Sequence, residues 1–427
     1  MNVVHAPLSQ FNRNTRLFIA ASAIFALGFF GIQTLLRVLY VLRLGHGPRY
    51  VGMFESAGAF TYMSMGMVSG AMGRRLGIRR TLLLGGIVTA IGMTALPLSE
   101  FVPPWAREFW PIVSNVATIA GWSILNVNLV AAMATTTTRR NRNSAYALGS
   151  ATRGAGMLAG TVFGGVLPGL FARVLHQNLN MPGPYRCGLW VGAGLASLGL
   201  IPLSLVGPVE PVASRQPARP RAALPLLPIV LMGVYVCLRH AGWATSQAFW
   251  NAYMDTALSV QTSSIGLITG AGQVLAILAS LLTPRLANRH GNGWLAMIST
   301  LAVAIGLIPL VLIPHWTAAA GAQLCVLAMS AVWLPALQAF QMEMVDSTWR
   351  STAYGAVSMA MGLGYGLVSL AGGYVVEAAG YRVLFLVGVV LTAMSVGPIW
   401  IVLRRRSARA AQPDSNPGTP GDEERAI

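Results

Sequence analysis

Long apolar runs alternate with short polar gaps along nearly the whole chain of 427 residues. A run of about 20 apolar residues spans a bilayer as an α-helix, which satisfies its own backbone hydrogen bonds inside lipid. The pattern therefore predicts an all-α membrane protein with twelve transmembrane helices. The predicted spans are residues 17–42, 50–72, 80–98, 109–133, 145–171, 187–208, 224–250, 263–284, 293–313, 316–342, 351–377 and 381–403.

The second half of the chain repeats the first. Residues 142–165 align without gaps to residues 350–373. The matching pairs are Arg142 and Arg350, Ala145 and Ala353, Tyr146 and Tyr354, Ser150 and Ser358, Gly154 and Gly362, Gly156 and Gly364, Gly164 and Gly372, and Gly165 and Gly373. In the second span and its following loop, Gly52, Ala57, Gly58, Arg75 and Gly77 recur as Gly266, Ala271, Gly272, Arg289 and Gly291. Two homologous six-helix halves with a site between them are typical of secondary transporters.

The polar gaps indicate how the chain is divided and oriented. The stretch 207–223, rich in proline and arginine, separates an N-terminal bundle (1–206) from a C-terminal bundle (224–406), and the polar tail 407–427 is predicted to be disordered. With the N-terminus inside, the cytoplasmic gaps hold twenty arginines and the outer gaps hold six. This bias follows the positive-inside rule, so we expect both termini in the cytoplasm. Arginine-only usage is typical of a GC-rich bacterial genome, and we therefore expect the cell inner membrane.

Composition supports a membrane protein and argues against several other classes. Hydrophobic residues make up 55% of the chain and only 10% are charged, whereas soluble proteins carry about 25% charged residues. The net charge of +17 lies in the gaps between apolar runs, so we expect no nucleic-acid partner. The chain has no lysine, which excludes a phosphate-loop lysine and a lysine Schiff base. No histidine pair has the spacing of metal ligands, and we expect no metal, cofactor or enzymatic activity.

The loop after the second span carries a recognisable signature. It reads Gly70-Ala71-Met72-Gly73-Arg74-Arg75-Leu76-Gly77-Ile78-Arg79-Arg80, which resembles the Gly-x-x-x-Asp-Arg-x-Gly-Arg-Arg motif of the major facilitator superfamily. The resemblance covers residues 17–403 and implies two pseudo-symmetric six-helix bundles. Arg74 stands where the family has aspartate, and Asn288 takes that place in the second copy. The candidates for a cytoplasmic gate are Arg74, Arg75, Gly77, Asn288, Arg289, Glu343 and Arg350.

The fifth span resembles the family's antiporter motif, Gly-x-x-x-Gly-Pro-x-x-Gly-Gly. Gly156, Gly160, Gly164 and Gly165 match, whereas Thr161 replaces the proline. Glycines four residues apart also allow helices to pack closely, so a packing role and an antiporter mark are both open, as are antiport and symport. The fourth span lacks the arginine motif common in proton-coupled drug exporters, which weighs against that subtype.

Ionisable residues inside the predicted spans are the candidates for chemistry, because charge within a membrane is costly and usually faces a cavity. Arg37 and Glu55 lie at similar depth on adjacent spans and are expected partners, while Arg153, Arg239 and His240 lie near the middle of the bilayer. The excess of arginine favours an anionic ligand, since a guanidinium binds carboxylate or phosphate through paired hydrogen bonds. The alternative is that each arginine binds backbone carbonyls or a nearby acid. Glu55 is the proton-coupling candidate, with a static ion pair as the alternative.

Polar and aromatic residues form stripes on two corresponding spans. Arg239, Trp243, Gln247 and Asn251 recur every fourth residue on the seventh span, which places them on one helix face. The first span has a shorter stripe. The candidate substrate-binding residues are Gln33, Arg37, Tyr40, Trp122, Asn126, Arg153, Arg239, His240, Trp243, Gln247, Asn251, Gln273, Trp333, Gln338 and Tyr365. Ordinary core packing is the alternative role for the aromatic and amide members.

These features predict a secondary active transporter that moves a small organic solute, by preference an anion, through alternating access. We expect the partners to be that solute, the lipid bilayer and, through Glu55, protons, and we expect a monomer. A proton-coupled exporter of drugs or metabolites is the alternative within the same fold. The alternative of another class is a membrane sensor or scaffold that binds a ligand without moving it.

Overall fold

The computed structural model describes residues 11–138, 141–207, 226–345 and 349–410. Within these ranges the chain is helical almost throughout and has no strand, which confirms the all-α prediction. The elements of the first half are α1 (Arg13–Phe25), η2 (Ala26–Gln33), α2 (Thr34–Arg43), α3 (Pro48–Leu76), α4 (Ile78–Ala95), η3 (Leu96–Glu100), η4 (Pro104–Ala106), α5 (Trp110–Thr136), α6 (Arg142–Val174), α7 (Pro182–Leu198) and α8 (Leu200–Ser204). The elements of the second half are α9 (Leu226–Ala252), η5 (Tyr253–Ala257), α10 (Thr262–His290), α11 (Asn292–Leu312), α12 (Trp316–Met344) and α13 (Arg350–Ala410).

Ten segments of the described chain are long and apolar enough to cross a membrane. Helix α3 is not among them but is 29 residues long, enough for a further span. One of the ten, Ala353–Arg405, contains a break at Gly380, whose φ of 79° and ψ of 171° are not helical. Helix α13 therefore holds two of the predicted spans, joined at a glycine in the predicted gap. Most of the predicted linker, 207–223, lies outside the described residues.

The loops of the two halves repeat each other in backbone conformation. Gly77, between α3 and α4, has φ 82° and ψ 150°, and Gly291, between α10 and α11, has φ 84° and ψ 151°. Positive φ at these values is accessible to glycine and strained for other residues. The two loops are the two copies of the sequence repeat, so the repeat extends to the local geometry.

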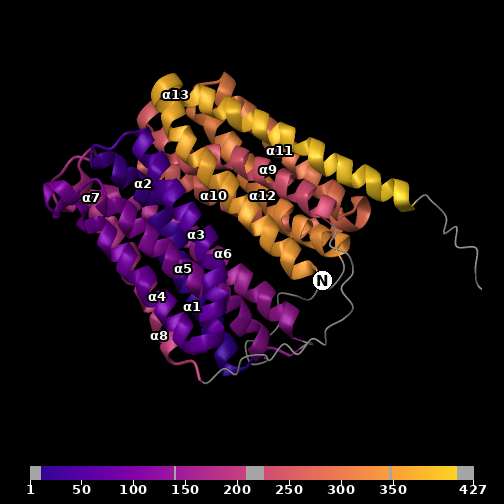
Figure 1. Ribbon diagram of the computed structural model, residues 1–427. Coiled ribbons are helices and arrows are strands. Elements are labelled where there is room, and N and C mark those ends of the chain that lie inside the picture. Colours follow the sequence, from indigo (N-terminus) through magenta and orange to yellow (C-terminus); the bar gives the residue numbers. More distant parts are fainter. Residues whose placement is uncertain (1–10, 139–140, 208–225, 346–348, 411–427) are drawn as a thin grey trace, which may run out of the picture.

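Figure 1 shows two groups of helices, α1–α8 in indigo to magenta and α9–α13 in red to yellow, that lean against each other at one end of the molecule. We call this the far end; it carries the loop between α2 and α3. The opposite end is the linker end, where Gly207 and Leu226 flank the segment outside the described residues.

Repeat-related glycines close the far end. A Cβ added to Gly165 of α6 would lie 3.1 Å from the Cα of Gly266 of α10, and one added to Gly52 of α3 would lie 3.0 Å from the Cα of Gly373 of α13. Gly165 aligns with Gly373, and Gly52 with Gly266. The crossing of α6 with α10 and the crossing of α13 with α3 are therefore related by the sequence repeat. At both crossings, small residues let the two backbones approach closely.

The remaining glycines of the α6 motif pack within the first half. Positions for a Cβ on Gly156 and Gly160 are occupied by the carbonyl oxygens of Ala23 and Leu27, which belong to the first membrane helix. Close helix packing thus accounts for these two glycines in this structure.

The facing helices are less closely packed toward the linker end. Helices α3 and α13 still touch where Gly362 meets the side chain of Met63. The backbones of the two halves therefore meet at the far end, and toward the linker end the glycine contacts between the halves are made with side chains.

Candidate functional site

Arg37, Glu55 and Tyr365 form a polar link between the two halves. Arg37 of α2 donates from Nη2 to Oε2 of Glu55 over 2.9 Å, and from Nη1 to Oδ1 of Asn115 over 3.3 Å. Tyr365 of α13 donates its hydroxyl to the same Glu55 oxygen over 3.3 Å. The expected partnership of Arg37 and Glu55 is confirmed. The contact with Tyr365 extends this charge-assisted pair from one half to the other.

Arg239 is a buried arginine that has no carboxylate partner in the described ranges. The residue is 1% exposed and donates from Nη2 to Oγ of Ser330 over 3.0 Å. Its guanidinium lies 3.9 Å from the centroid of the Trp333 ring. Trp333 is held in turn by a 2.7 Å hydrogen bond from its Nε1 to the hydroxyl of Tyr235. The cation–π contact and the hydrogen bond position Arg239 but leave its charge without a counter-ion.

Aromatic contacts join Arg239 to the Glu55 link. The ring of His240 lies 5.2 Å from Trp333 and 5.4 Å from Trp243, measured between centroids. The ring of Trp243 lies 5.8 Å from that of Tyr365, which reaches Glu55. We call this continuous set the central cluster; its members are Arg37, Glu55, Arg239, His240, Trp243, Trp333 and Tyr365. All seven are residues predicted from the sequence, and they come from both halves.

Many of the predicted residues hold buried polar atoms without a hydrogen-bond partner. Thirteen side chains in the described part of the chain have such an atom, and nine of them are predicted site residues. These nine are Gln33, Arg37, Glu55, Asn126, Arg239, His240, Trp243, Gln247 and Gln273. Buried polar groups in folded proteins are nearly always paired, so a concentration of unpaired ones calls for a functional explanation. A polar ligand that binds between the halves would supply the partners.

Both helices that carry the polar stripes contain a π-helical turn. The first runs over Ala26–Gln33 and the second over Tyr253–Ala257. π-Helical turns occur frequently at functional sites, because they shift the direction of the side chains that follow. Gln33 ends the first turn, four residues before Arg37.

Two predicted residues pack within the first half, apart from the central cluster. Tyr40 is fully buried and donates its hydroxyl to the Pro97 carbonyl over 3.1 Å. The ring of Trp122 packs on Phe29 and Phe30, with centroid distances of 5.2 and 4.9 Å. For both residues these contacts match the packing alternative.

The other predicted residues take three different positions. Asn126 donates to the hydroxyl of Tyr62 over 3.3 Å, and Arg153 is half-buried. Gln273 of α10 donates to Oγ1 of Thr161 over 2.9 Å. Thr161 is the residue that replaces the motif proline of α6, so this substitution provides a hydrogen bond between the halves. Asn251 is half-buried and Gln338 is exposed.

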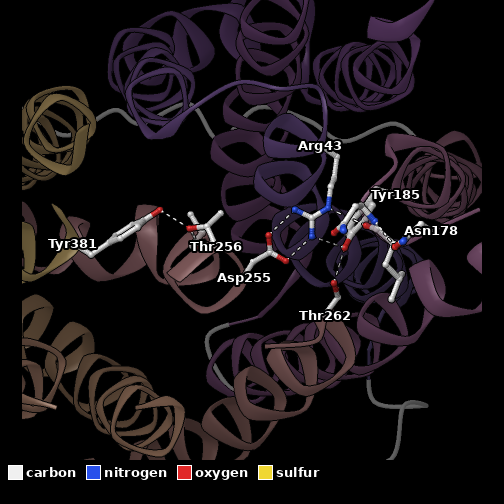
Figure 2. A network of polar contacts seen from close by, with 10 residues as sticks. Arg43, Asn178, Tyr185, Asp255, Thr256, Thr262 and Tyr381 are labelled. Atoms are coloured by element: carbon white, nitrogen blue, oxygen red, sulfur yellow. Dashed lines mark hydrogen bonds and ion pairs between the residues drawn. The ribbon is translucent and has the colours of Figure 1, made fainter. Parts of the chain in front are cut away.

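A second polar network ties the two halves together at the far end, and Figure 2 shows it at close range. Arg43 of α2 and Asp255 of η5 form two parallel hydrogen bonds of 2.7 Å each. Arg43 also donates to the Leu179 carbonyl over 3.0 Å. Close by, the hydroxyls of Tyr185 and Thr262 lie 2.9 Å apart across the same boundary. Paired arginine–carboxylate bonds are among the strongest in proteins, so this far-end network holds the halves together.

This network was not predicted from the sequence. Arg43 and Asp255 lie just outside the predicted spans 17–42 and 224–250, and no sequence pattern paired them. The sequence contained one indication of the network: each of the two residues lies at the outer end of the helix that carries the polar stripe of its half. A second ion pair, 3.0 Å between Arg186 and Glu100, is also new but lies within the first half.

The predicted cytoplasmic gate residues lie at the linker end. Arg74, Arg75, Asn288 and Arg289 are exposed. Glu343 accepts a 2.6 Å hydrogen bond from Asn292. The side chain of Arg350 is outside the described part of the structure.

Several solved structures of membrane transporters have the same fold as this chain. A bacterial homologue of the human lysosomal transporter Spinster, in an inward-facing and occupied conformation, is 14% identical; the match covers 91% of this chain and 96% of that chain, with a TM-score of 0.71. The nucleoside transporter NupG (16% identity, 92% and 99% covered, TM-score 0.70) and a D-xylose–proton symporter (15%, 90% and 97%, 0.71) are similar to the same degree. At sequence identities of 14–16%, the similarity to these structures establishes the fold of this chain.

One curated protein gives a short sequence match. Dipeptide and tripeptide permease B of Xenorhabdus bovienii (strain SS-2004) is 39% identical over 79 residues. The match spans 18% of this chain and 16% of the permease.

The family model described as the Major Facilitator Superfamily matches residues 18–250 and 231–421. The two matches together cover nearly the whole chain, and the paired halves, the repeated loops and the solved relatives agree with them. The chain therefore belongs to the major facilitator superfamily and has its transporter fold.

Proposed function

We propose that the protein is a secondary transporter that carries a small organic solute with a carboxylate or similar anionic group. The observation that carries this proposal is Arg239, a buried guanidinium with no carboxylate partner in the described ranges. A buried charge without a counter-ion costs several kcal/mol. An anionic ligand would remove that cost on binding, so its affinity for the site would be high relative to a neutral analogue.

Alternating access is the proposed mode of movement. The Arg43–Asp255 pair and the crossing glycines support a closed far end, and the two groups of helices lean together at that end (Figure 1). If both termini face the cytoplasm, as the arginine bias predicts, this arrangement faces inward in the cell inner membrane. Transport would require the far-end network to break while the linker end closes.

Proton coupling through Glu55 is the finer part of the proposal. The Glu55 carboxylate is buried and accepts hydrogen bonds from both halves through Arg37 and Tyr365. Protonation would remove the negative charge that both donors bind, and charge-assisted bonds are about twice as strong as neutral ones. A proton on Glu55 would therefore loosen the link between the halves, which is the property a coupling residue needs.

Flux into proteoliposomes tests the proposal. The panel contains organic carboxylates, neutral sugars and nucleosides, and cationic dyes, each with and without a pH gradient. We expect carboxylates to be transported and Arg239→Gln to abolish their flux, while Arg107→Ala, an exposed arginine in the far-end loop, serves as the matched control. Flux of cationic dyes alone would favour the exporter alternative. Binding without any flux would favour the sensor or scaffold.

A further inference from the structure

The unpaired polar atoms of the central cluster differ in kind between the two halves. In the first half, the Oε1 atom of Glu55 is buried and has no partner. In the second half, the Nε atom of Arg239, the Nε1 atom of Trp243 and the Nδ1 atom of His240 are buried and have none. The imidazole nitrogen of His240 can donate or accept, so it does not set the polarity of the second half. A carboxylate oxygen can only accept when ionised, and the guanidinium and indole nitrogens can only donate. One half therefore offers an acceptor and the other offers donors.

The neighbouring amides follow the same division. The unpaired atoms of Gln33 and Asn126 in the first half are oxygens, and that of Gln247 in the second half is a nitrogen. An amide can turn over and exchange these roles, whereas the chemistry of Glu55, Arg239 and Trp243 fixes theirs. The unpaired Nε of Arg37 belongs to a guanidinium already bonded to Glu55, and the oxygen of Gln273 belongs to an amide already bonded to Thr161.

Charge divides in the same way. The Glu55 carboxylate carries the only negative charge of the cluster, and it lies beside Arg37 in the first half. Arg239 carries a positive charge in the second half, with no acid to balance it in the described ranges. A ligand that satisfies both sides must donate hydrogen bonds at one end and accept them at the other.

We propose that the solute is a zwitterion, whose ammonium group binds Glu55 and whose carboxylate binds the donors of α9, with Tyr365 between the two ends. This inference rests on the proposed function and names its substrate class. The Tyr365 side chain spans the distance between Glu55 and Trp243, since it contacts both. A dipeptide carries its two charged groups about 7 Å apart, so a short peptide is a suitable probe for such a site.

The zwitterion also gives the ligand a part in joining the halves. Its two charged groups bind residues of opposite halves. Each of them gives a hydrogen-bond partner to a buried polar group that has none within the protein. A solute that has only the carboxylate would satisfy α9 and leave the Glu55 oxygen without a partner. A buried unpaired acceptor costs about 1–3 kcal/mol, which is a loss of about 5- to 150-fold in affinity.

Three matched probes separate the two ends of the ligand: alanyl-alanine, its N-acetyl derivative, which lacks the ammonium, and its C-terminal amide, which lacks the carboxylate. Their binding to the purified full-length protein is measured by titration calorimetry. We expect alanyl-alanine to bind at least about fivefold more tightly than either derivative. Glu55→Gln should remove the preference over the N-acetyl form, and Trp243→Phe should reduce the preference over the amide while keeping the ring.

Gln341→Met is the control, because Gln341 also has a buried unpaired nitrogen but lies outside the central cluster. It should leave all three affinities unchanged. Equal binding of alanyl-alanine and the N-acetyl form, with weak binding of the amide, would overturn the zwitterion and leave a carboxylate transporter standing. Equal binding of the amide would overturn both proposals. If none of the three probes binds, the zwitterion of this length is wrong, and the carboxylate flux panel then decides the proposed function separately.

Discussion

The far-end pair between Arg43 and Asp255 gives the sharpest mechanical prediction. The two side chains are only 15% and 6% exposed. They form two hydrogen bonds of 2.7 Å each between the halves, although the two residues are 212 positions apart in the sequence. Asp255→Asn removes the negative charge and keeps the shape. Arg43 would then lie in the closed far end with only neutral partners, the Leu179 carbonyl and the Tyr185 hydroxyl.

The magnitude follows from the burial of the pair. Removing one partner of a buried ion pair costs about 3–5 kcal/mol, and water would solvate Arg43 when the far end opens. The neutral partners that stay offset part of this, so we take about 3 kcal/mol against the closed state. That energy shifts the equilibrium toward far-end opening by about two orders of magnitude.

Thiol labelling at Ser369 measures this shift. Ser369 of α13 is fully buried at the far end, where its carbonyl faces Gly52. The reporter Ser369→Cys is placed in a protein whose three native cysteines, Cys187, Cys237 and Cys325, have been replaced. We expect Asp255→Asn to raise the rate of labelling by a membrane-impermeant maleimide by about 100-fold.

Glu100→Gln is the matched control for this experiment. Glu100 pairs with Arg186 over 3.0 Å at the same end, but both residues belong to the first half. Its loss should leave the labelling rate unchanged, because no contact between the halves is broken. Equal labelling of the Asp255→Asn and unsubstituted proteins would refute the claim that this pair holds the far end closed.

Three further predictions follow from the same structure. Gly165→Leu should prevent close contact with Gly266 and raise Ser369→Cys labelling, and unchanged labelling would contradict the role of the glycine crossing. Glu55→Gln should keep downhill flux but lose the response to a pH gradient; a preserved response would exclude Glu55 as the coupling residue. Burial lowers the pKa of His46 in the far-end loop below 6.5, so the unfolded chain binds the proton more readily and stability should fall as pH drops through 6.5. Thermal unfolding at pH 5 and 8 should show this loss, and His46→Gln should reduce it.

The sequence predicted the helices because burial in lipid allows few backbone solutions. Apolar length alone located the spans, and the repeat identified the loops around Gly77 and Gly291, which adopt the same backbone angles. The partnership of Arg37 and Glu55 could also be predicted, since both lie at similar distances from Gly45 on the two arms of one hairpin. Helical periodicity likewise grouped Arg239 with Trp243 on α9.

Contacts between the halves could not be predicted in this way. The bond from Tyr365 to Glu55 and the pair of Arg43 with Asp255 depend on how two separate bundles are docked, which no local pattern encodes. Tyr40 shares a helix face with predicted site residues, and its hydroxyl binds the Pro97 carbonyl within the first half, a contact that the helix face does not reveal. Depth and helix face therefore narrow the candidates, and only the docked halves show which of them meet.

The central claim is that Arg239 binds the anionic group of a transported solute. The most direct test is exchange of a labelled carboxylate solute in proteoliposomes that contain the unsubstituted protein, Arg239→Lys or Arg239→Gln, with thermal unfolding used to show that each variant is folded. We predict that the lysine variant keeps partial exchange, because it keeps the charge but loses the forked geometry, and that the glutamine variant has none. Full carboxylate exchange by a folded Arg239→Gln protein would contradict the account.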